Sequence, residues 1–497
     1  MSMNFSFDIF RNTVSGGRAP RPEPEAPFRI LVMGDFSGRE NRGQVEALDT
    51  RTATKVDIDN LETLMRTWKT RLGLRAGHEG AFGIGFGELD HFHPDQIFGR
   101  VELFTAMRDL RARLTSPSGS AAAAAEVRAW AQSKPASTVE PKPMEAPATP
   151  SSEFESLLSG SAGAAPKAAA GQVESLIRDL IRPHIVPSSA PDLGELVALV
   201  DQTISSQMRS VLHDAAFQSL EANWRSLHML ITGLETGEEL QVFVLDASRV
   251  ELEQDVFSNG ARGLHALLTE RPRSTPGGNP WSVICLLERF GGATVDAQLL
   301  GGLAVCAHAS GAALLAGACD QLAGAASIAR DPRPENWNVS LAPDDAAAWQ
   351  LVRSLGEASS VGLVLPRVLG RLPYGRRTEP VDAFAFEELT GAGAHEHLLW
   401  TNPAAHATLL LGRAFADAGW SLDPQAGGDI DGLPVYVPDA GPDRTAVPCA
   451  EAWLTDSASQ KLLDRGLIPV LSVQHRDAVR IPRLCAINGR RLHASWA

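Results

Sequence analysis

Residues 361–389 read VGLVLPRVLGRLPYGRRTEPVDAFAFEEL and form the most informative segment of the chain. The segment begins as an apolar run typical of a buried strand, breaks at Pro366, turns at residues 373–375 and resumes as a strand-like run at 381–386. Each proline lacks a backbone donor and disfavours helix in the residue before it. The segment therefore predicts a packed connection rather than a plain helix, and it contains no catalytic constellation.

The same segment resembles the signature of the large contractile-sheath subunit of bacterial type VI secretion systems, the family called TssC or VipB. The matching residues follow one another in the family order: Leu365, Pro366, Arg367, Leu369, Arg371, Leu372, Pro373, Tyr374, Gly375, Thr378, Pro380, Val381, Phe384, Phe386, Glu387 and Glu388. The helical pattern at 212–231, LHDAAFQSLEANWRSLHMLI, is also similar to the large subunit, with Trp224 in register. This resemblance covers residues 173 to about 480.

A second resemblance covers residues 28 to about 114. A short apolar run at 28–33 leads into Gly34, Asp35 and Phe36, which is similar to the start of the small sheath subunit, TssB or VipA. Residues 56–65 and 89–97 resemble further elements of that subunit. The two resemblances together imply an α/β fold, a sheath-subunit-like mixed body with a small-subunit-like and a large-subunit-like half.

Composition and resemblance divide the chain into four parts. Residues 1–27 are expected to hold an N-terminal strand and a Pro-rich spacer, 28–115 the small-like part, and 173–497 the large-like part. Residues 116–172, rich in Ala and Pro, predict a flexible, disordered linker with room for a short helix at 120–132, because such a segment buries too little apolar surface to offset its ordering entropy. Large subunits normally continue for roughly another domain, so the large-like part is expected to be shortened at its C-terminus. We therefore expect limited assembly by the protein alone.

Two short segments are candidates for contacts with other proteins. Phe5, Phe7 and Ile9 alternate with polar residues, as in a strand that could pair with a sheet edge on a neighbouring subunit. Phe154, Leu157 and Leu158 would share one face of a helix. They resemble the segment that large sheath subunits offer to a Clp-type AAA+ ATPase, although a transient amphipathic turn that docks on its own protein remains the alternative.

Charge and apolar content argue against nucleic-acid and membrane partners. The formal net charge is −14, whereas affinity for nucleic acid comes mainly from clustered Lys and Arg. The N-terminus lacks the pattern of a secretory leader, and there is no run of about 18 apolar residues. The five cysteines form no Cys-x-x-Cys pair, which indicates free thiols. A cytoplasmic protein without membrane insertion is expected.

Ligand-capable histidines occur at two places in the sequence. The first set is His91 and His93 with Asp95, and the second is His395 and His397 with His406. Neither set has a third group at a recognised zinc spacing, so no metal is expected. The glycines of 83–87 and of 34–38 lack the features of nucleotide-binding motifs and are predicted to form turns. Ser37 lies in no nucleophile elbow, and no cofactor is expected.

Four arginines of the signature region could bind an anion. They are followed closely by acidic residues, so pairing with these or with a neighbouring subunit is the preferred interpretation. The arginines are Arg367, Arg371, Arg376 and Arg377, and the acidic residues are Glu379, Asp382, Glu387 and Glu388.

The resemblance implies a structural component of a type VI contractile sheath that is not an enzyme. In that family, the subunits surround an inner tube of an Hcp-type protein, start from a baseplate, and contract to drive the tube outward. The expected partners are therefore other sheath subunits or further copies of the chain itself, the inner tube and the baseplate. A non-polymerising accessory that binds sheath or baseplate ends is the main alternative, and a hydrolase using one of the histidine sets is a remote one.

Overall fold

The structure of the chain is a computed structural model. It describes residues 22–23, 25–76, 80–132, 173, 176–178, 180–181, 192–274, 278–390, 394–423, 425–438 and 446–496. The chain forms two compact units. We call them the sheet unit, made of Met1–Trp68, Ser219–Leu372 and Leu398–Ala497, and the helical unit, made of Lys69–Gln218 and Pro373–His397. Each unit takes residues from both the small-like and the large-like parts.

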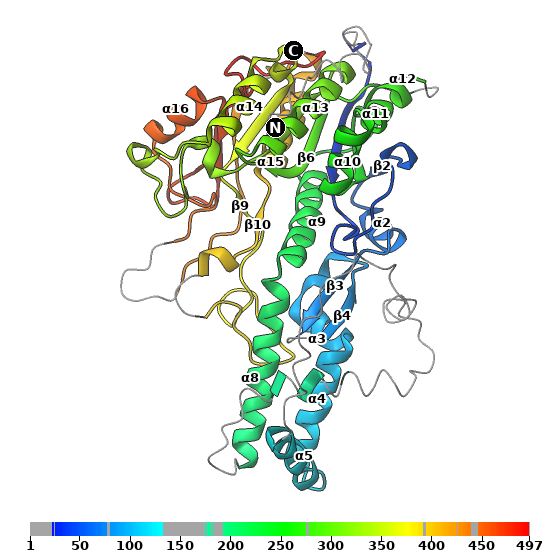
Figure 1. The fold of residues 1–497 in the computed structure, drawn as a ribbon, viewed down its shortest axis with the longest axis vertical. Helices are drawn as coiled ribbons and strands as arrows, with labels where there is room; N and C mark the ends of the chain where they lie inside the picture. The colour runs from blue at the N-terminus through cyan, green and yellow to red at the C-terminus, as the bar shows by residue number, and fades with distance from the viewer. Residues whose placement is uncertain are drawn as a thin grey trace. The chain divides into compact units, whose positions relative to one another are not determined.

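A seven-stranded sheet forms the centre of the sheet unit (Figure 1). Its strands lie in the order β12 (Leu467–Pro469), β8 (Val361–Leu365), β7 (Ala313–Ala318), β6 (Val283–Phe290), β1 (Phe28–Gly34), β5 (Leu240–Asp246) and β2 (Thr54–Val56). All neighbours are parallel except β2, which is antiparallel to β5. The central parallel strands β1, β7 and β8 are nearly continuous apolar runs, as expected for parallel strands buried on both faces.

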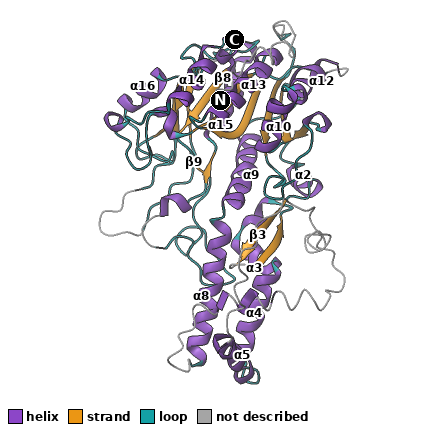
Figure 2. Ribbon diagram, in the orientation of Figure 1, coloured by secondary structure: helices purple, strands orange, loops and turns teal. Residues whose placement is uncertain are grey.

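Helices cover both faces of this sheet (Figure 2). Because successive side chains of a strand point to opposite faces, Ile284 and Leu286 join the core on the side of α13 (Thr294–Ser310), whereas Cys285 hydrogen-bonds Thr408 of α15 (Pro403–Ala418). The other helices with residues in this unit are α2 (Leu61–Thr67), α9 (Ala215–Gly233), α10 (Arg249–Asn259), α11 (Arg262–His265), α12 (Arg271–Ser274), α14 (Pro343–Ser354) and α16 (Asp456–Asp464). The result is a doubly wound α/β layer structure.

Smaller elements complete the sheet unit. The short strands are β9 (Val368–Leu369) paired with β10 (Trp400–Thr401), and β11 (Ala426–Ile430), β14 (Val479–Arg483) and β13 (Leu471–Ser472) in a three-stranded antiparallel sheet. The short helical turns are η1 (Leu48–Thr50), η4 (Ala266–Glu270), η5 (Asp320–Ala323), η6 (Pro334–Asn336), η7 (Gly356–Ser360) and η9 (Gly419–Ser421).

The helical unit combines a hairpin with packed helices. Its elements are β3 (Arg71–Ala76), β4 (Gly80–Gly85), η2 (Leu89–Phe92), α3 (Pro94–Arg100), α4 (Glu102–Thr115), α5 (Ser120–Gln132), α8 (Leu193–Leu212), the first residues of α9, and η8 (Ala394–His397). Helix α4 packs against both α5 and α8. The rings of Phe86 and Phe92 stack at 4.2 Å, and Phe217 meets both edge-on at 5.8 and 5.6 Å. A capping box of Asp192 and Glu195 fixes the start of α8.

The structure confirms the predicted mixed α/β fold class and corrects two local expectations. Residues 381–386 do not form a strand, and the glycines at 83 and 85 lie in β4 rather than in a turn. The helix at 120–132 is present as α5, with Ala123, Ala124 and Val127 buried, so the expected linker begins later than residue 116. Its remainder, 133–172, lies outside the described residues.

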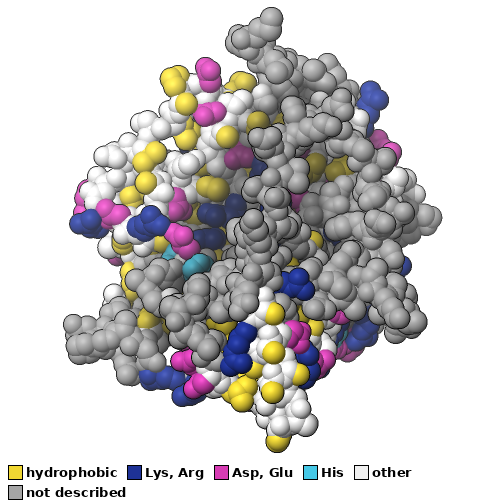
Figure 3. All heavy atoms as spheres, turned by 60° about the horizontal axis from the view of Figure 1, so that its bottom comes forward, with side chains coloured by type: hydrophobic (Ala, Val, Ile, Leu, Met, Phe, Trp, Pro, Cys, Tyr) yellow, Lys and Arg dark blue, Asp and Glu magenta, His cyan; other side chains and the backbone are white. Residues whose placement is uncertain are grey.

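On the face shown in Figure 3, acidic and basic side chains lie interspersed over the described surface. Among the described residues, no helix combines the length and the apolar character that crossing a bilayer requires. All five cysteines are free, and four of them are buried.

Candidate functional site

The loop that follows β1 is organised by the carboxylate of Asp35. Its Oδ1 accepts the backbone N–H groups of Gly38 and Arg39 at 2.7 and 2.9 Å, and its Oδ2 accepts that of Glu40 at 2.9 Å. Gly38 has φ of 77°, a left-handed conformation that glycine adopts without strain. The carboxylate of Asp35 is therefore used to fold its own loop.

An aromatic cluster anchors this loop to α9. The ring of Phe36 is fully buried and meets Trp224 edge-on at 5.1 Å, and Trp224 Nε1 donates to the carbonyl of Phe36 at 2.8 Å. A side chain at Gly34 would come within 3.3 Å of Leu287 Cβ and 3.4 Å of the Asn223 amide, so glycine suits this close approach. Gly34, Phe36 and Trp224, singled out from the sequence, thus form one packed contact.

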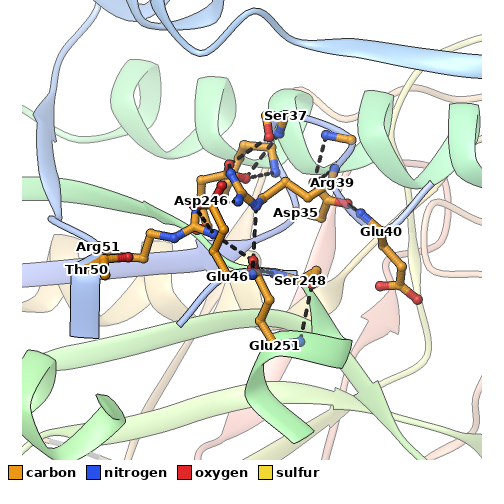
Figure 4. A network of polar contacts seen from close by, with 12 residues as sticks. Asp35, Ser37, Arg39, Glu40, Glu46, Thr50, Arg51, Asp246, Ser248 and Glu251 are labelled. Atoms are coloured by element: carbon orange, nitrogen blue, oxygen red, sulfur yellow. Dashed lines mark hydrogen bonds and ion pairs between the residues drawn. The ribbon is translucent and has the colours of Figure 1, made fainter. Parts of the chain in front are cut away.

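A buried polar network joins the loop to the end of β5 and the start of α10 (Figure 4). Asp246 accepts the N–H groups of Phe36 and Ser37 at 2.8 and 3.1 Å, and the hydroxyl of Ser37 donates to its other oxygen at 2.7 Å. Burial raises the pKa of Asp246 above its ordinary value, despite the opposing hydrogen bond from Ser37. Ser37 therefore acts as a structural donor.

Glu251 holds the second half of the network together. It closes a capping box with Ser248 at the start of α10, and its Oε1 lies 3.1 Å from Arg39 Nε and 2.6 Å from Arg51 Nη2. Burial lowers the pKa of Arg39, but the surrounding carboxylates, with Glu251 first, outweigh this effect and leave it raised. The arginine is consequently charged and fixed in place.

The first part of the signature segment packs within the sheet unit. Strand β8 lies between β7 and β12, and Leu365, Pro366 and Leu369 are buried. Arg367 pairs with Glu451, its Nε lying 3.0 Å from Oε2. These contacts fix the connection that follows β8.

A buried ion cluster links the signature segment to α9. Glu221 of α9 is fully buried, and its Oε1 lies 2.8 Å from Arg371 Nε and 2.8 Å from Arg225 Nε. Arg371 also donates to the carbonyl of Leu372 at 3.0 Å. Burial by itself would raise the pKa of Glu221, but the two arginines reverse the effect and lower it. The buried carboxylate is therefore ionised and doubly paired.

The second part of the signature segment packs within the helical unit. Tyr374 and Glu388 are bridged by two hydrogen bonds, from the N–H of Tyr374 to the Glu388 carboxylate at 2.7 Å and from the N–H of Glu388 to the Tyr374 carbonyl at 2.8 Å. Pro373 and Gly375 flank the tyrosine and are buried. The turn predicted at 373–375 is thus closed by a glutamate from the end of the segment.

Residues 381–386 are held by α3 instead of by a strand partner. The carboxylate of Asp95 accepts the N–H groups of Asp382 and Ala383 at 3.1 and 2.9 Å. The ring of Phe384 lies 4.7 Å from Phe98 and 5.4 Å from Phe386. This contact explains why the alternating pattern does not form a strand here.

Models of known protein families match this chain. Residues 194–482, more than half of the chain, match the family model of VipB, described as EvpB/VC_A0108, tail sheath N-terminal domain. The chain belongs to the VipB tail-sheath family. Residues 16–132 match a second model, that of the type VI secretion system protein VipA, described as VipA, VC_A0107 or Hcp2.

A curated relative supports the same assignment. The chain is 28% identical over 341 residues to the type VI secretion system sheath protein TssC1 of Pseudomonas aeruginosa, covering 66% of this chain and 68% of the relative. This VipB-family chain is therefore a type VI secretion sheath protein with a small-subunit-like segment in the same polypeptide, and its role is structural. Both resemblances seen in the sequence are confirmed.

The arginines of the VipB signature pair differently from what proximity in the sequence suggested. The partners of Arg367 and Arg371 are Glu451 and Glu221, which lie far away in the sequence. Of the nearby acidic residues, Glu387 accepts a hydrogen bond from the backbone N–H of Arg376 at 3.2 Å. Arg367 and Arg371 therefore pair with carboxylates, as preferred over anion binding. The carboxylates are different ones from those expected.

The candidate metal residues of this VipB-family chain make other contacts. His91 lies 2.9 Å from Glu88, and His93 caps α3 by accepting the N–H of Asp95. His395 and His397 belong to the helical unit, whereas His406 is buried in the sheet unit. Within the described ranges, no three His, Cys, Asp or Glu side chains are grouped so that they could hold a metal ion.

Two proposed contact segments lie outside the described residues. They are the N-terminal strand of Phe5, Phe7 and Ile9, and the ATPase-recognition segment of Phe154, Leu157 and Leu158. Both remain predictions from the sequence.

Sequence reasoning missed the acidic residues that organise the VipB-family core. Asp246, Glu251 and Glu451 were not singled out, although each accepts hydrogen bonds or ion pairs from a motif residue. A signal existed for Asp246, because it ends an apolar run just as Asp35 follows another. Carboxyl ends of neighbouring parallel strands meet at one sheet edge, so two such acids belong to the same region.

Proposed function

We propose that the protein is a contractile-sheath subunit in which the VipA-like and VipB-like parts act as one folded building block. It would surround an inner tube of an Hcp-type protein, start from a baseplate, and contract to drive that tube outward. The observation that carries this proposal is the position of β1. This strand lies in the segment that matches VipA, yet it is inserted between β5 and β6 of the segment that matches VipB.

Sharing a sheet makes the two parts mutually dependent. Phe28, Ile30, Leu31, Val32 and Met33 of β1 are at most 1% exposed. A covalent connection fixes a one-to-one ratio of the parts and keeps one near the other at about millimolar effective concentration. Such a unit suits a lattice, because a symmetric assembly repeats one building block.

Contacts beyond the building block are assigned to the two short segments. The alternating residues Phe5, Phe7 and Ile9 would add a strand to a sheet edge on a neighbouring subunit, where main-chain hydrogen bonds supply affinity. Phe154, Leu157 and Leu158 would bind a Clp-type AAA+ ATPase as a short helix in a groove. The sequence patterns support both assignments.

Electron microscopy of reconstituted sheaths tests the proposed function. The full-length protein, mixed with separately produced small and large sheath subunits, is expected to enter the tubes along their length. A variant lacking residues 1–12 is expected to enter them poorly, because it lacks the donated strand. Binding at tube ends alone would favour the accessory role, and no association with tubes would contradict a sheath role of either kind.

A further inference from the structure

A cavity of about 210 Å³ lies in the sheet unit beside the edge of the large sheet. Its walls include Leu31 of β1, Leu245 of β5 and Leu267 of η4, all buried. Trp281, Arg29 and Arg271 also line it, so a mainly apolar space meets two guanidinium groups and one indole. Neither the polar network of Figure 4 nor the signature segment contributes to this cavity.

Arg29 brings an unneutralised charge to the cavity. Its guanidinium lies 4.4 Å from the centre of the Phe243 ring and 4.2 Å from that of Trp281, and it donates to the carbonyl of Asn279. In the part of the chain that the structure describes, no carboxylate pairs with Arg29. Burial lowers the pKa of Arg29 to about 10, as expected for a desolvated cation without an acidic partner.

Trp281, which lines the cavity, carries a donor without a partner among the described residues. Its side chain is 3% exposed, and its Nε1–H finds no hydrogen-bond partner among the described residues. Buried donors in native proteins are almost always satisfied, so an orphaned indole N–H beside a cavity indicates a missing acceptor. Arg271, by contrast, donates to the backbone carbonyls of Asp49 and Arg51.

We propose that this cavity binds a small monocarboxylate with an apolar body. The carboxylate accepts hydrogen bonds from Arg29 and Trp281, and the body packs against Leu31, Leu245 and Leu267. A cavity of about 150 Å³ holds benzene, so the larger space here accommodates a phenyl ring with a short acidic arm. The proposal goes beyond sheath assembly and does not depend on it.

The charge and chemistry of the ligand follow from the lining. A neutral ligand would leave Arg29 without a counter-charge, and charge-assisted hydrogen bonds are about twice as strong as neutral ones. A dianion would place a second negative charge against the apolar part of the lining, which is formed by three leucines, Ala53 and Pro272. A monoanion matches the charge of Arg29, while Arg271 is engaged by the backbone carbonyls of Asp49 and Arg51.

Titration calorimetry with the full-length protein tests the proposal. Phenylacetate is the probe, and phenylacetamide is the neutral control of the same shape. Phenylacetate is expected to bind with one-to-one stoichiometry and to raise the melting temperature, while phenylacetamide binds about tenfold more weakly or not at all. No binding of phenylacetate up to about 10 mM, or equal binding of both compounds, would overturn the proposal.

Three variants locate the site. Arg29→Met is expected to weaken phenylacetate binding about tenfold or more, and Trp281→Phe, which keeps the ring but removes the N–H, about three- to tenfold. Arg66→Met is the matched control, because Arg66 is exposed on α2 and pairs with Glu62. If Arg29→Met fails to fold, Trp281→Phe still tests the proposed site. Unchanged phenylacetate binding by that variant would contradict the assignment.

A further measurement distinguishes between two kinds of ligand, a free small molecule and the C-terminus of a protein chain. A short peptide ending in a phenylalanine carboxylate is compared with phenylacetate. Peptide binding weaker than or equal to that of phenylacetate is expected. Peptide binding at least about tenfold tighter would assign the cavity to a protein terminus and overturn the small-molecule proposal.

Discussion

At the residue scale, Glu221 is a buried charge that joins α9 to the signature segment. Its carboxylate is fully buried between Arg371 and Arg225, and Arg371 is only 6% exposed. A buried ion pair adds little to the free energy of unfolding when it is compared with apolar side chains in place of both partners. Removal of one partner is costly, because it leaves the other charge buried and uncompensated. The lowered pKa of Glu221 means that its stabilisation is present above its ordinary pKa and is lost as the pH falls through the lowered value.

Glu221→Gln is therefore expected to lower the free energy of unfolding by about 3 kcal/mol. Urea denaturation followed by tryptophan fluorescence measures this change. Glu62→Gln is the control, because Glu62 pairs with Arg66 at the same 2.8 Å but both side chains are more than half exposed. The control should change stability by at most about 0.5 kcal/mol. Equal effects of the two substitutions would contradict the role of burial.

His406 is a second residue whose burial has a measurable consequence. It is 2% exposed in α15, and burial lowers its pKa to about 4 from the ordinary 6.5. Between these values the unfolded chain binds a proton that the folded chain does not. Stability should therefore fall as the pH drops from about 6.5 toward 4, by at most about 3 kcal/mol from this group.

His406→Gln should reduce this pH dependence. The variant keeps a polar side chain of similar size but cannot titrate. Unfolding free energies of the natural protein and the variant are compared at pH 7 and pH 5. The natural protein is expected to lose about 1 to 2 kcal/mol more than the variant between these values. Parallel losses in the two proteins would show that His406 is not buried as a neutral group.

At the scale of elements, the sequence predicted the long buried ones well. The apolar run at 28–33 lies in strand β1, and most of the helical pattern at 212–231 lies in α9. The conformation of these segments follows from the spacing of their own apolar residues, because each segment buries a continuous face. The signature segment likewise contains a strand, a break and a closed turn, as its prolines indicate.

Elements whose conformation depends on distant partners could not be predicted. Residues 381–386 alternate like a strand, but their backbone donors are taken by Asp95, from a different part of the chain. The same applies to the polar network, where Phe36 and Asp246 are 210 positions apart. The spacing of apolar residues indicates which face of an element is buried, but it does not indicate which other element packs against that face. Glu451 and Glu251 could not be predicted for the same reason, because their partners lie far away in the sequence.

The proposed ATPase-recognition segment leads to an element-scale prediction. Leu157→Asp with Leu158→Asp is expected to abolish binding to the N-terminal domain of a Clp-type AAA+ ATPase, because three apolar side chains at about 1.5 to 3 kcal/mol each would supply the affinity. Fluorescence anisotropy of the labelled protein measures it. Ser152→Asp with Ser156→Asp adds the same charge without removing a leucine and should retain most of the binding. Equal binding by both double variants would assign the segment to a plain linker.

At the scale of the whole molecule, the shared sheet determines how the chain folds. Five side chains of β1 become almost fully buried on folding. Their burial stabilises the folded state by roughly 10 kcal/mol, at about 2 kcal/mol for each side chain. That amount is comparable with the entire net stability of a typical domain, about 5 to 15 kcal/mol. Without β1, the facing edges of β5 and β6 would also be left unpaired.

Fragments test this dependence. Residues 173–497 produced alone are expected to aggregate, because they lack the strand between β5 and β6. Produced together with residues 1–132, they should co-purify as a stable one-to-one complex on size-exclusion chromatography. As a control, the full chain carrying a protease site at residue 150 should remain one particle after cleavage. A 173–497 fragment that is folded and monomeric and does not bind residues 1–132 would show that the VipB-like part is complete without β1. The proposal of a single building block would then be wrong.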